Sequence, residues 1–268
     1  MNPRTSLIIS TFNWPEALEL TLISAAKQTV LPLEVVIADD GSREETRQMI
    51  ERMQRDYPIP IRYVWHPDDG FRKTIILNRA FAEAEGDYLI QVDGDVMLHP
   101  RFVEDHLRFC RKGYFIAGAR ILTSEALKNR YVEEKNTDFS IFHRGAQNIL
   151  NGIRWPFLTP LMYNYKGSEK DIQHVKGCNM AFWKEDIFRI NGYDETFTGW
   201  GLEDSDIAVR LHRSGVKKRY LKFAGIMCHL WHKQFSRSRE ELNRSAMFVN
   251  IREGIVRCPQ GIFSPVGS

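Results

Sequence analysis

Short apolar runs alternate with amphipathic stretches through the first ~120 residues of the chain. The apolar runs cover residues 6–11, 33–38, 61–65 and 88–92. Between them, helical spacing of apolar residues predicts a helix opening at Pro15 and further helices over about 43–55 and 73–85. Alternation of short strands and helices predicts an α/β fold with a mostly parallel central sheet flanked by helices.

The pattern changes after Gly118. Residues 124–172 mix aromatics, Asn, Gly and Pro with weak periodicity, which predicts an irregular insertion with one or two short helices, suited to acceptor contacts. Regular patterning returns at 175–182, in a helix over 202–212 before Gly215, and in a last helix over about 238–252 with Leu242, Met247 and Ile251 on one side. We expect one domain in two halves, residues 1–120 and 121–268.

Composition is that of an ordinary globular protein. The chain has 268 residues, of which 43% are apolar and 26% charged. Because no apolar run approaches the ~20 residues of a membrane span and the N-terminus lacks a secretory leader, we expect a cytoplasmic protein. The four cysteines have no C-x-x-C spacing, which argues against a zinc ribbon or a redox motif and favours reduced thiols.

The net charge of +3 is too small to indicate a nucleic-acid partner. Basic residues nevertheless gather in the C-terminal third, opposed mainly by Glu240 and Glu241: Arg210, Arg213, Lys217, Lys218, Arg219, Lys222, Lys233, Arg237, Arg239 and Arg244. A solvated basic face is the favoured interpretation. The alternative is attraction to anionic headgroups or to a phosphate-bearing acceptor, with peripheral contact at the inner face of the membrane.

Polar clusters follow four of the predicted strands, at residues 10–13, 39–42, 66–72 and 93–95. Open parallel sheets bind ligands beyond the carboxyl ends of their strands, so these clusters predict a nucleotide site at one edge. An aspartate after the second strand can accept a hydrogen bond from a base or a ribose. Residues 39–42 equally suit a turn followed by a helix N-cap.

Asp93 and Asp95 flank Gly94 directly after a buried strand. In an extended segment, side chains two apart lie on the same side, and the glycine permits close approach of a ligand. Such a pair can hold a divalent cation that neutralises a departing diphosphate. By itself the pattern is common in solvated turns, and its position after a strand is what favours a site.

Glycine and tryptophan precede an acidic helix start at residues 199–206. Helix-dipole complementarity accounts for Glu203, Asp204 and Asp206 in the first turn. It does not account for Trp200 between two glycines. A flat aromatic beside a flexible backbone suits stacking on a sugar ring, with a carboxylate placed to accept its hydroxyl proton.

Two histidines, His229 and His232, lie three residues apart in the segment 227–233. In an extended segment this spacing points them to opposite faces, so one of them is expected as a metal ligand rather than both. An imidazole beside two carboxylates would favour Mn²⁺ over Mg²⁺.

Taken together, these motifs resemble the inverting glycosyltransferases of family 2, which have the GT-A fold. The second half resembles bacterial chondroitin polymerase and the β1,4-galactosyltransferases. The resemblance covers about residues 5–235 in consistent order, through segments 7–13, 38–42, 69–71, 77–79, 86–88, 93–95, 177–182, 192–195, 199–204 and 225–227. An ordered set of motifs is far more specific than any one of them.

The resemblance implies roles for individual residues. Asp40 would contact uracil, with Thr11 and Asn13 lining the same pocket and Asn78 also on the donor side. Asp93 and Asp95 would hold the metal and the donor phosphates, completed by His229 or His232. Asp204 would be the catalytic base; Glu203, Trp200 and Gly201 would contact the acceptor, with Glu203 also placed to bind the donor sugar. The chain departs from the pattern at two places. It has Leu77-Asn78-Arg79 where such enzymes commonly carry Arg-Asn in the middle motif, and it has Leu202 where the galactosyltransferases have a second glycine.

The implied activity is transfer of a hexose or N-acetylhexosamine from a UDP-sugar to a glycan or lipid-linked saccharide, with inversion and with Mn²⁺ or Mg²⁺, in bacterial surface polysaccharide synthesis. Residues 1–120 would bind the nucleotide sugar, and residues 121–268 the acceptor. The alternatives are a retaining transferase or a nucleotidyltransferase on a similar sheet, and a non-catalytic nucleotide-sugar-binding protein. The acids at 93, 95, 203 and 204 argue against the last, because a binding module has little use for a base.

Overall fold

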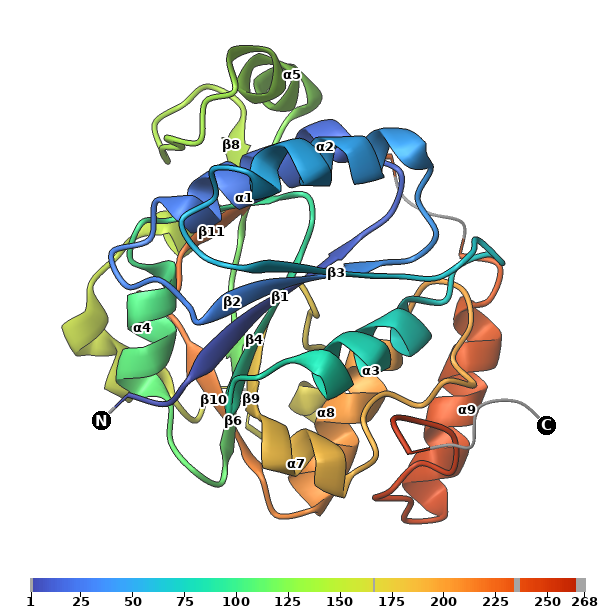
Figure 1. Ribbon diagram of the computed structural model, residues 1–268. Coiled ribbons are helices and arrows are strands. Elements are labelled where there is room, and N and C mark those ends of the chain that lie inside the picture. The colour runs from blue at the N-terminus through green and yellow to red at the C-terminus, as the bar shows by residue number, and fades with distance from the viewer. Residues whose placement is uncertain (1, 166, 234–236, 264–268) are drawn as a thin grey trace.

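A seven-stranded sheet forms the centre of the computed structural model, which describes residues 2–165, 167–233 and 237–263 (Figure 1). In spatial order its strands are β10 (Lys217–Leu221), β6 (Tyr114–Gly118), β9 (Asn179–Trp183), β4 (Tyr88–Asp93), β1 (Thr5–Thr11), β2 (Glu34–Asp39) and β3 (Ile61–Trp65). The pairs are parallel except those of β9, which runs antiparallel to β4 and β6. The alternating pattern of the N-terminal half is thereby confirmed as a mostly parallel sheet.

Helices cover both faces of this sheet. One face packs against α1 (Pro15–Ala26), α2 (Glu44–Gln54) and α4 (Phe102–Phe109). The other packs against α3 (Lys73–Glu83), α7 (Lys184–Arg189) and α8 (Glu203–Arg213). Figure 1 shows α1 and α2 above the sheet and α3, α7 and α8 below it. Pro15 opens α1, where its missing N–H and restricted φ are tolerated.

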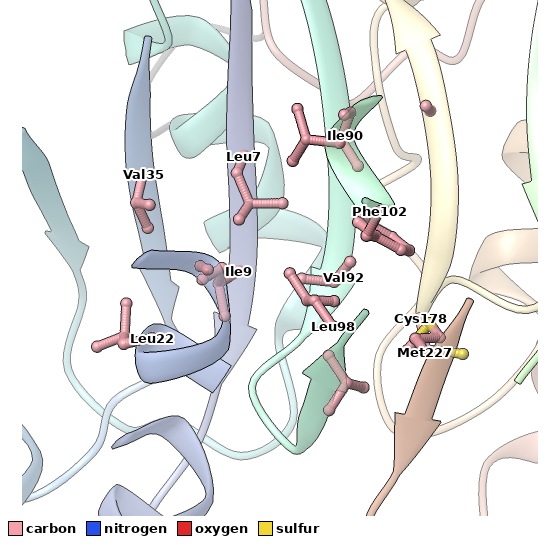
Figure 2. Packing of buried hydrophobic residues seen from close by; sticks show 14 of the residues in the cluster. Leu7, Ile9, Leu22, Val35, Ile90, Val92, Leu98, Phe102, Cys178 and Met227 are labelled. Carbon is pink, nitrogen blue, oxygen red and sulfur yellow. The ribbon is translucent and has the colours of Figure 1, made fainter. Parts of the chain in front are cut away.

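Successive side chains of β1 point alternately to the two faces of the central sheet. Leu7 and Ile9 point to the face of α1, where Figure 2 shows them beside Val35, Ile90 and Val92. Ile8 points to the face of α3. Every residue of β1 is buried because both faces are covered, which explains why these strands read as continuous apolar runs.

A second, four-stranded sheet adjoins the end of β4. Its order is β5 (Val96–Leu98), β11 (Met227–His229), β7 (Ile121–Thr123) and β8 (Ala146–Gln147). β5 follows β4 after two residues and pairs antiparallel with β11, so that His229 lies opposite Val96. This pairing brings the histidines to the segment of Asp93 and Asp95.

The region 124–172 contains α5 (Glu125–Glu134), the 3₁₀ helices η1 (Ile149–Gly152) and η2 (Pro156–Met162), and α6 (Glu169–Ile172). The insertion therefore holds four helical elements, more than the one or two short helices that its sequence predicted. The last helix is α9 (Glu240–Arg252), in which Met247 is buried, Ile251 is partly buried and Leu242 is exposed. The four cysteines are free. Among the described residues, no helix has the length and apolar character needed to cross a membrane.

Candidate active site

A cavity of about 650 Å³ opens at the carboxyl ends of β1, β2 and β4. Its wall includes Thr11, Asp40, Asp93 and Asp95 from the first half of the chain. From the second half it includes the following residues: Lys176, Gly177, Trp200, Glu203, Asp204, His229 and His232. Segments more than a hundred residues apart in sequence therefore share one pocket.

The two aspartates after β2 have different surroundings. Asp39 is fully buried, where its Oδ1 accepts a hydrogen bond from the Ser42 N–H (2.7 Å) and its Oδ2 one from the Tyr63 hydroxyl (2.7 Å). Asp40 lines the cavity, with Oδ1 2.7 Å from His66 Nε2 and Oδ2 accepting from the Arg72 N–H (2.9 Å). Asp39 thus makes the predicted turn, and Asp40 is the carboxylate that lines the cavity.

Asn13 lies outside the cavity lining. Its backbone has a positive φ of 47°, its N–H donates to Ser42 Oγ (2.7 Å), and its side-chain oxygen accepts from the Arg43 N–H (2.9 Å). These bonds tie the loop after β1 to the loop after β2. Thr11, by contrast, lines the cavity, so of the two residues only Thr11 borders the expected donor pocket.

Asp93 at the end of β4 is paired with a lysine that the sequence analysis did not identify. Lys73 Nζ donates to Asp93 Oδ1 at 2.6 Å, and the Ser10 hydroxyl donates to the same atom at 3.0 Å. Burial opposes ionisation of Asp93, but the Lys73 ammonium lowers its pKa to about 2. In turn, burial works against the ammonium, while Asp93, and after it Asp204 and Glu203, raise the pKa of Lys73 above its ordinary value.

Asp95 lies in the turn after β4 with both histidines beside it. His229 Nε2 is 3.4 Å from Asp95 Oδ1, and His232 Nε2 is 3.5 Å from Asp95 Oδ2. One ligand atom from each of the three residues lies within 4.8 Å of the others. The expectation that the histidines point to opposite faces was wrong, because the chain leaves β11 at His229 before it reaches His232.

These three residues fit a divalent cation. His229 Nδ1 lies 2.9 Å from the Leu230 carbonyl and His232 Nδ1 2.9 Å from the Lys233 carbonyl, which places the ring proton on Nδ1 and leaves Nε2 to act as a ligand. Asp95 Oδ1 is buried without a hydrogen-bond partner, and such an oxygen is suited to act as a cation ligand. Asp93 is not in this group, because the turn at Gly94 separates the carboxylates and Lys73 holds Asp93.

Glu203 and Asp204, which also line the cavity, begin α8. Asp204 Oδ2 accepts from the Gly177 N–H (2.7 Å), and Oδ1 accepts from the Tyr193 hydroxyl (3.0 Å). A Cβ at Gly177 would lie 2.2 Å from Asp204 Oδ1, so only glycine allows this approach. The two donors orient the Asp204 carboxylate toward the cavity as a hydrogen-bond acceptor.

Glu203 is almost completely buried. Its Oε2 accepts from the Gly201 N–H at 3.0 Å. Burial first, and then the charge of Asp204, raise the pKa of Glu203 to about 7, with Lys73 opposing the shift. Adjacent carboxylates in one pocket with different environments can divide proton-transfer and hydrogen-bonding roles between them.

The segment before α8 needs unusual backbone conformations. Gly199, Gly201 and Leu202 have φ values of 74°, 111° and 74°. Leu202 is therefore in a region that L-residues with a side chain rarely adopt, which explains why glycine suits this position in the galactosyltransferase pattern. Trp200 lines the cavity, and the Arg237 guanidinium lies 5.2 Å from its ring centre.

Asn78 is buried away from the cavity lining. Its Nδ2 donates to the Tyr193 carbonyl and to Glu195 Oε1 (both 2.9 Å), and its Oδ1 accepts from the Tyr193 N–H (2.8 Å). Tyr193 is the residue that donates to Asp204. The placement favours a positioning role for Asn78 over the direct donor contact that the resemblance implies.

Three residues of the site gave weak signals in sequence. Lys73 and Arg120 line the cavity, and Tyr193 stands behind it. Lys73 lies one residue beyond the polar cluster 66–72, and Tyr193 lies in the 192–195 motif. Neither pattern indicates which residue forms a hydrogen bond with the Lys73 or the Tyr193 side chain. Arg120 follows β6 and donates to Cys178 Sγ at 3.1 Å, a partner 58 residues away.

Fold and site together define a GT-A glycosyltransferase. Residues 6–183 match glycosyl transferase family 2, and the chain belongs to this family. Residues 162–233 also match the family described as the N-terminal domain of galactosyltransferase. This second match covers Gly177, Glu203, Asp204, His229 and His232.

Several characterised glycosyltransferases are similar in sequence. Chondroitin synthase of Escherichia coli is 25% identical, over 90% of this chain and 36% of that protein. Hyaluronan synthase of Pasteurella multocida is 27% identical, over 90% and 26%. Validoxylamine A glucosyltransferase of Streptomyces hygroscopicus subsp. limoneus is 29% identical, over 80% and 49%. The chain thus spans a quarter to a half of the length of these relatives.

Two solved structures share the fold. A mannosyltransferase from Pyrobaculum calidifontis in complex with GDP-Man and Mn²⁺ superposes with a TM-score of 0.61 at 17% identity, covering 97% of this chain and 66% of that one. Staphylococcus aureus TarS superposes with a TM-score of 0.63 at 16% identity, covering 92% and 39%. At such identities the likeness concerns the fold alone.

Proposed function

We propose that this chain is a divalent-cation-dependent inverting glycosyltransferase that uses a UDP-sugar, carrying a hexose or an N-acetylhexosamine, and a glycan or lipid-linked saccharide acceptor. The observation that carries the proposal is the shared cavity: the Asp95, His229 and His232 group and the Glu203–Asp204 pair line the same pocket. A sugar ring between them would meet a cation-binding group on one side and a carboxylate base on the other.

Asp204 is the base of the proposed reaction. Its carboxylate takes the proton of an acceptor hydroxyl, and the hydroxyl oxygen then bonds to the anomeric carbon as the bond from that carbon to the diphosphate breaks. Attack opposite the leaving group inverts the anomeric configuration. The Gly177 N–H and the Tyr193 hydroxyl hold Asp204 in place, so little reorganisation is needed when the proton transfers.

The side of the cavity that carries the cation group binds the leaving nucleotide. A cation held by Asp95, His229 and His232 would supply Lewis-acid stabilisation of the charge that develops on the diphosphate. Asp40 and Thr11 border the part of the cavity beyond β1 and β2, where we place the nucleoside. Lys73 and Arg120 add positive charge between this region and the acids of α8.

A panel of UDP- and GDP-sugars with Mn²⁺, scored by release of the nucleoside diphosphate, tests the proposal. We expect turnover with a UDP-sugar, loss of turnover in EDTA and recovery when Mn²⁺ is restored. Product NMR should show an anomeric configuration opposite to that of the donor. Retention of configuration would refute the displacement mechanism, turnover with GDP-sugars alone would refute the uridine assignment, and UDP binding without transfer or hydrolysis would indicate a binding protein.

A further inference from the structure

Large apolar side chains are exposed in one segment of the insertion. Of the 16 large apolar side chains exposed among the described residues, seven fall within the 24 residues 142–165. These are Phe142, Ile149, Leu150, Trp155, Phe157, Leu161 and Tyr165, of which Phe157 and Leu161 are 71% and 79% exposed. Scattered apolar residues are normal at a protein surface, whereas such a concentration marks a contact surface.

The same segment carries no acidic residue. Residues 139–168 contain no Asp or Glu, although the chain has 34 of them, and they include Arg144, Arg154 and Lys166. Arg144 is exposed. An apolar surface rich in aromatic residues, with an exposed arginine and no acidic residue in its own segment, is complementary to the acyl boundary and the anionic headgroups of a lipid bilayer.

The backbone of this segment is compatible with an interface of low polarity. The Trp155 carbonyl accepts from the Leu158 N–H, and the Pro160 carbonyl from the Tyr163 N–H, within η2. The Leu150 carbonyl accepts from Lys222 Nζ at 3.0 Å. Backbone groups that are paired internally lose less when water is removed from around them.

The segment is also firmly attached to the rest of the fold. Arg154 binds Asp105 of α4 through two hydrogen bonds of 2.9 and 2.6 Å. The Trp155 N–H donates to the Phe223 carbonyl, and the Tyr220 N–H of β10 donates to the Tyr163 carbonyl. In Figure 1 the segment runs from the region of β8, near α5, to the yellow-green coil beside α4. Its outward apolar side chains are therefore presented on a rigid base.

The other concentrations of apolar or basic residues lack this combination. α9 exposes Leu242, Phe248 and Val249, but Glu240, Glu241 and Glu253 accompany them. The basic C-terminal third is solvated only in part, because Lys217, Lys233, Arg237, Arg239 and Arg244 are exposed and the others are not. Arg210 is 1% exposed and bound to Asp206 at 2.7 Å, Arg213 pairs with Glu169 at 2.9 Å, and Arg244 pairs with Glu240 at 2.8 Å.

We infer that residues 142–165 form a docking surface for an anionic lipid bilayer, with Trp155, Phe157 and Leu161 entering the acyl boundary and Arg144 meeting the headgroups. Gln147 of the same segment lines the cavity, three residues before Leu150. Docking therefore brings the rim of the cavity to the membrane surface. The value of that position for a lipid-linked acceptor depends on the proposed function, whereas docking itself does not.

Flotation of the whole chain with vesicles tests this inference. We expect binding to phosphatidylcholine vesicles that contain phosphatidylglycerol, and much weaker binding to phosphatidylcholine alone. The double variant Phe157→Glu with Leu161→Glu should bind at least about tenfold more weakly, since two large apolar contacts are replaced by charges that the headgroups repel. The matched control, Leu242→Glu with Phe248→Glu on α9, should bind like the wild type.

Thermal unfolding serves to check that each variant is folded. We expect all of them to be folded, because Phe157 and Leu161 are highly exposed. Donor turnover with a water-soluble acceptor should be unchanged in the double variant, so loss of vesicle binding is separated from any failure of the proposed function. Three results would overturn the inference: no binding by the wild type, equal loss in the α9 control, or a dimer in sedimentation velocity that the Phe157 and Leu161 substitutions dissociate.

Discussion

The Tyr193 hydroxyl lies 3.0 Å from Asp204 Oδ1 and donates a hydrogen bond to it. Tyr193 is itself anchored by Asn78, which binds both its N–H and its carbonyl, and its hydroxyl also contacts Gln91 of β4. Together with the Gly177 N–H, this network fixes the proposed base from three separate segments of the chain. The 192–195 motif thereby has a structural explanation: it orients the carboxylate at the start of α8.

Asp204→Asn removes the proposed base with little change of shape. We expect kcat to fall by about 10²–10⁴-fold, the range of a general base, while UDP and Mn²⁺ still bind, because the cation group consists of Asp95, His229 and His232 and does not include Asp204. Steady-state kinetics and calorimetric titration of UDP with Mn²⁺ give the two values. Asp138→Asn, at an exposed aspartate, serves as the control. Simultaneous loss of turnover and of nucleotide binding would contradict the assignment.

Replacing the residues of the cation group should act on metal binding first. Asp95→Asn should abolish metal-dependent UDP binding, and His229→Ala and His232→Ala should each weaken Mn²⁺ binding by at least about 10–100-fold, since both rings face Asp95. Mn²⁺ electron paramagnetic resonance measures the free ion directly. The exposed His174→Ala provides the comparison. Unchanged Mn²⁺ affinity in the Asp95 variant would exclude this site.

The raised pKa of Glu203 predicts a pH dependence of stability. Its folded pKa of about 7 exceeds its ordinary value of 4.5, so the folded protein holds this proton more tightly than the unfolded chain does. The free energy of unfolding should therefore fall as pH rises from about 4.5 to about 7, by roughly 1–3 kcal/mol from this group. Glu203→Gln should remove this component. Urea unfolding of both proteins across this pH range, without metal, measures it; parallel profiles would show that Glu203 does not titrate there.

Lys73→Met should destabilise the protein, because Asp93 would remain as a buried carboxylate without its cation. We expect a loss of roughly 3 kcal/mol, and recovery of most of it in the double variant Lys73→Met with Asp93→Asn. Urea unfolding in EDTA keeps metal binding out of the measurement. Arg47→Met, in the exposed pair with Glu51, should show no measurable change. A double variant no more stable than Lys73→Met would mean that the two residues are not coupled.

Several features of the fold could be predicted from local pattern alone. The strands over 6–11, 33–38, 61–65 and 88–92 and the helices between them appear within one or two residues of their expected bounds, because each has its own periodicity and its own boundary residues. Two strands that escaped prediction, β6 and β10, have five residues, and four others, β5, β7, β8 and β11, have only two or three. Such a strand has too few positions to show a period, and its existence depends on the strand beside it.

The sequence by itself determined the order of the elements and the residue types available at the carboxyl ends of the strands, since both follow from local spacing. Only the tertiary structure decided that Asp40 rather than Asp39 faces the cavity, that His229 and His232 converge on Asp95, and that Lys73 pairs with Asp93. The reason is physical: a side chain's direction depends on the turn that carries it and on partners from distant segments, and neither is expressed in the spacing of residues along the chain.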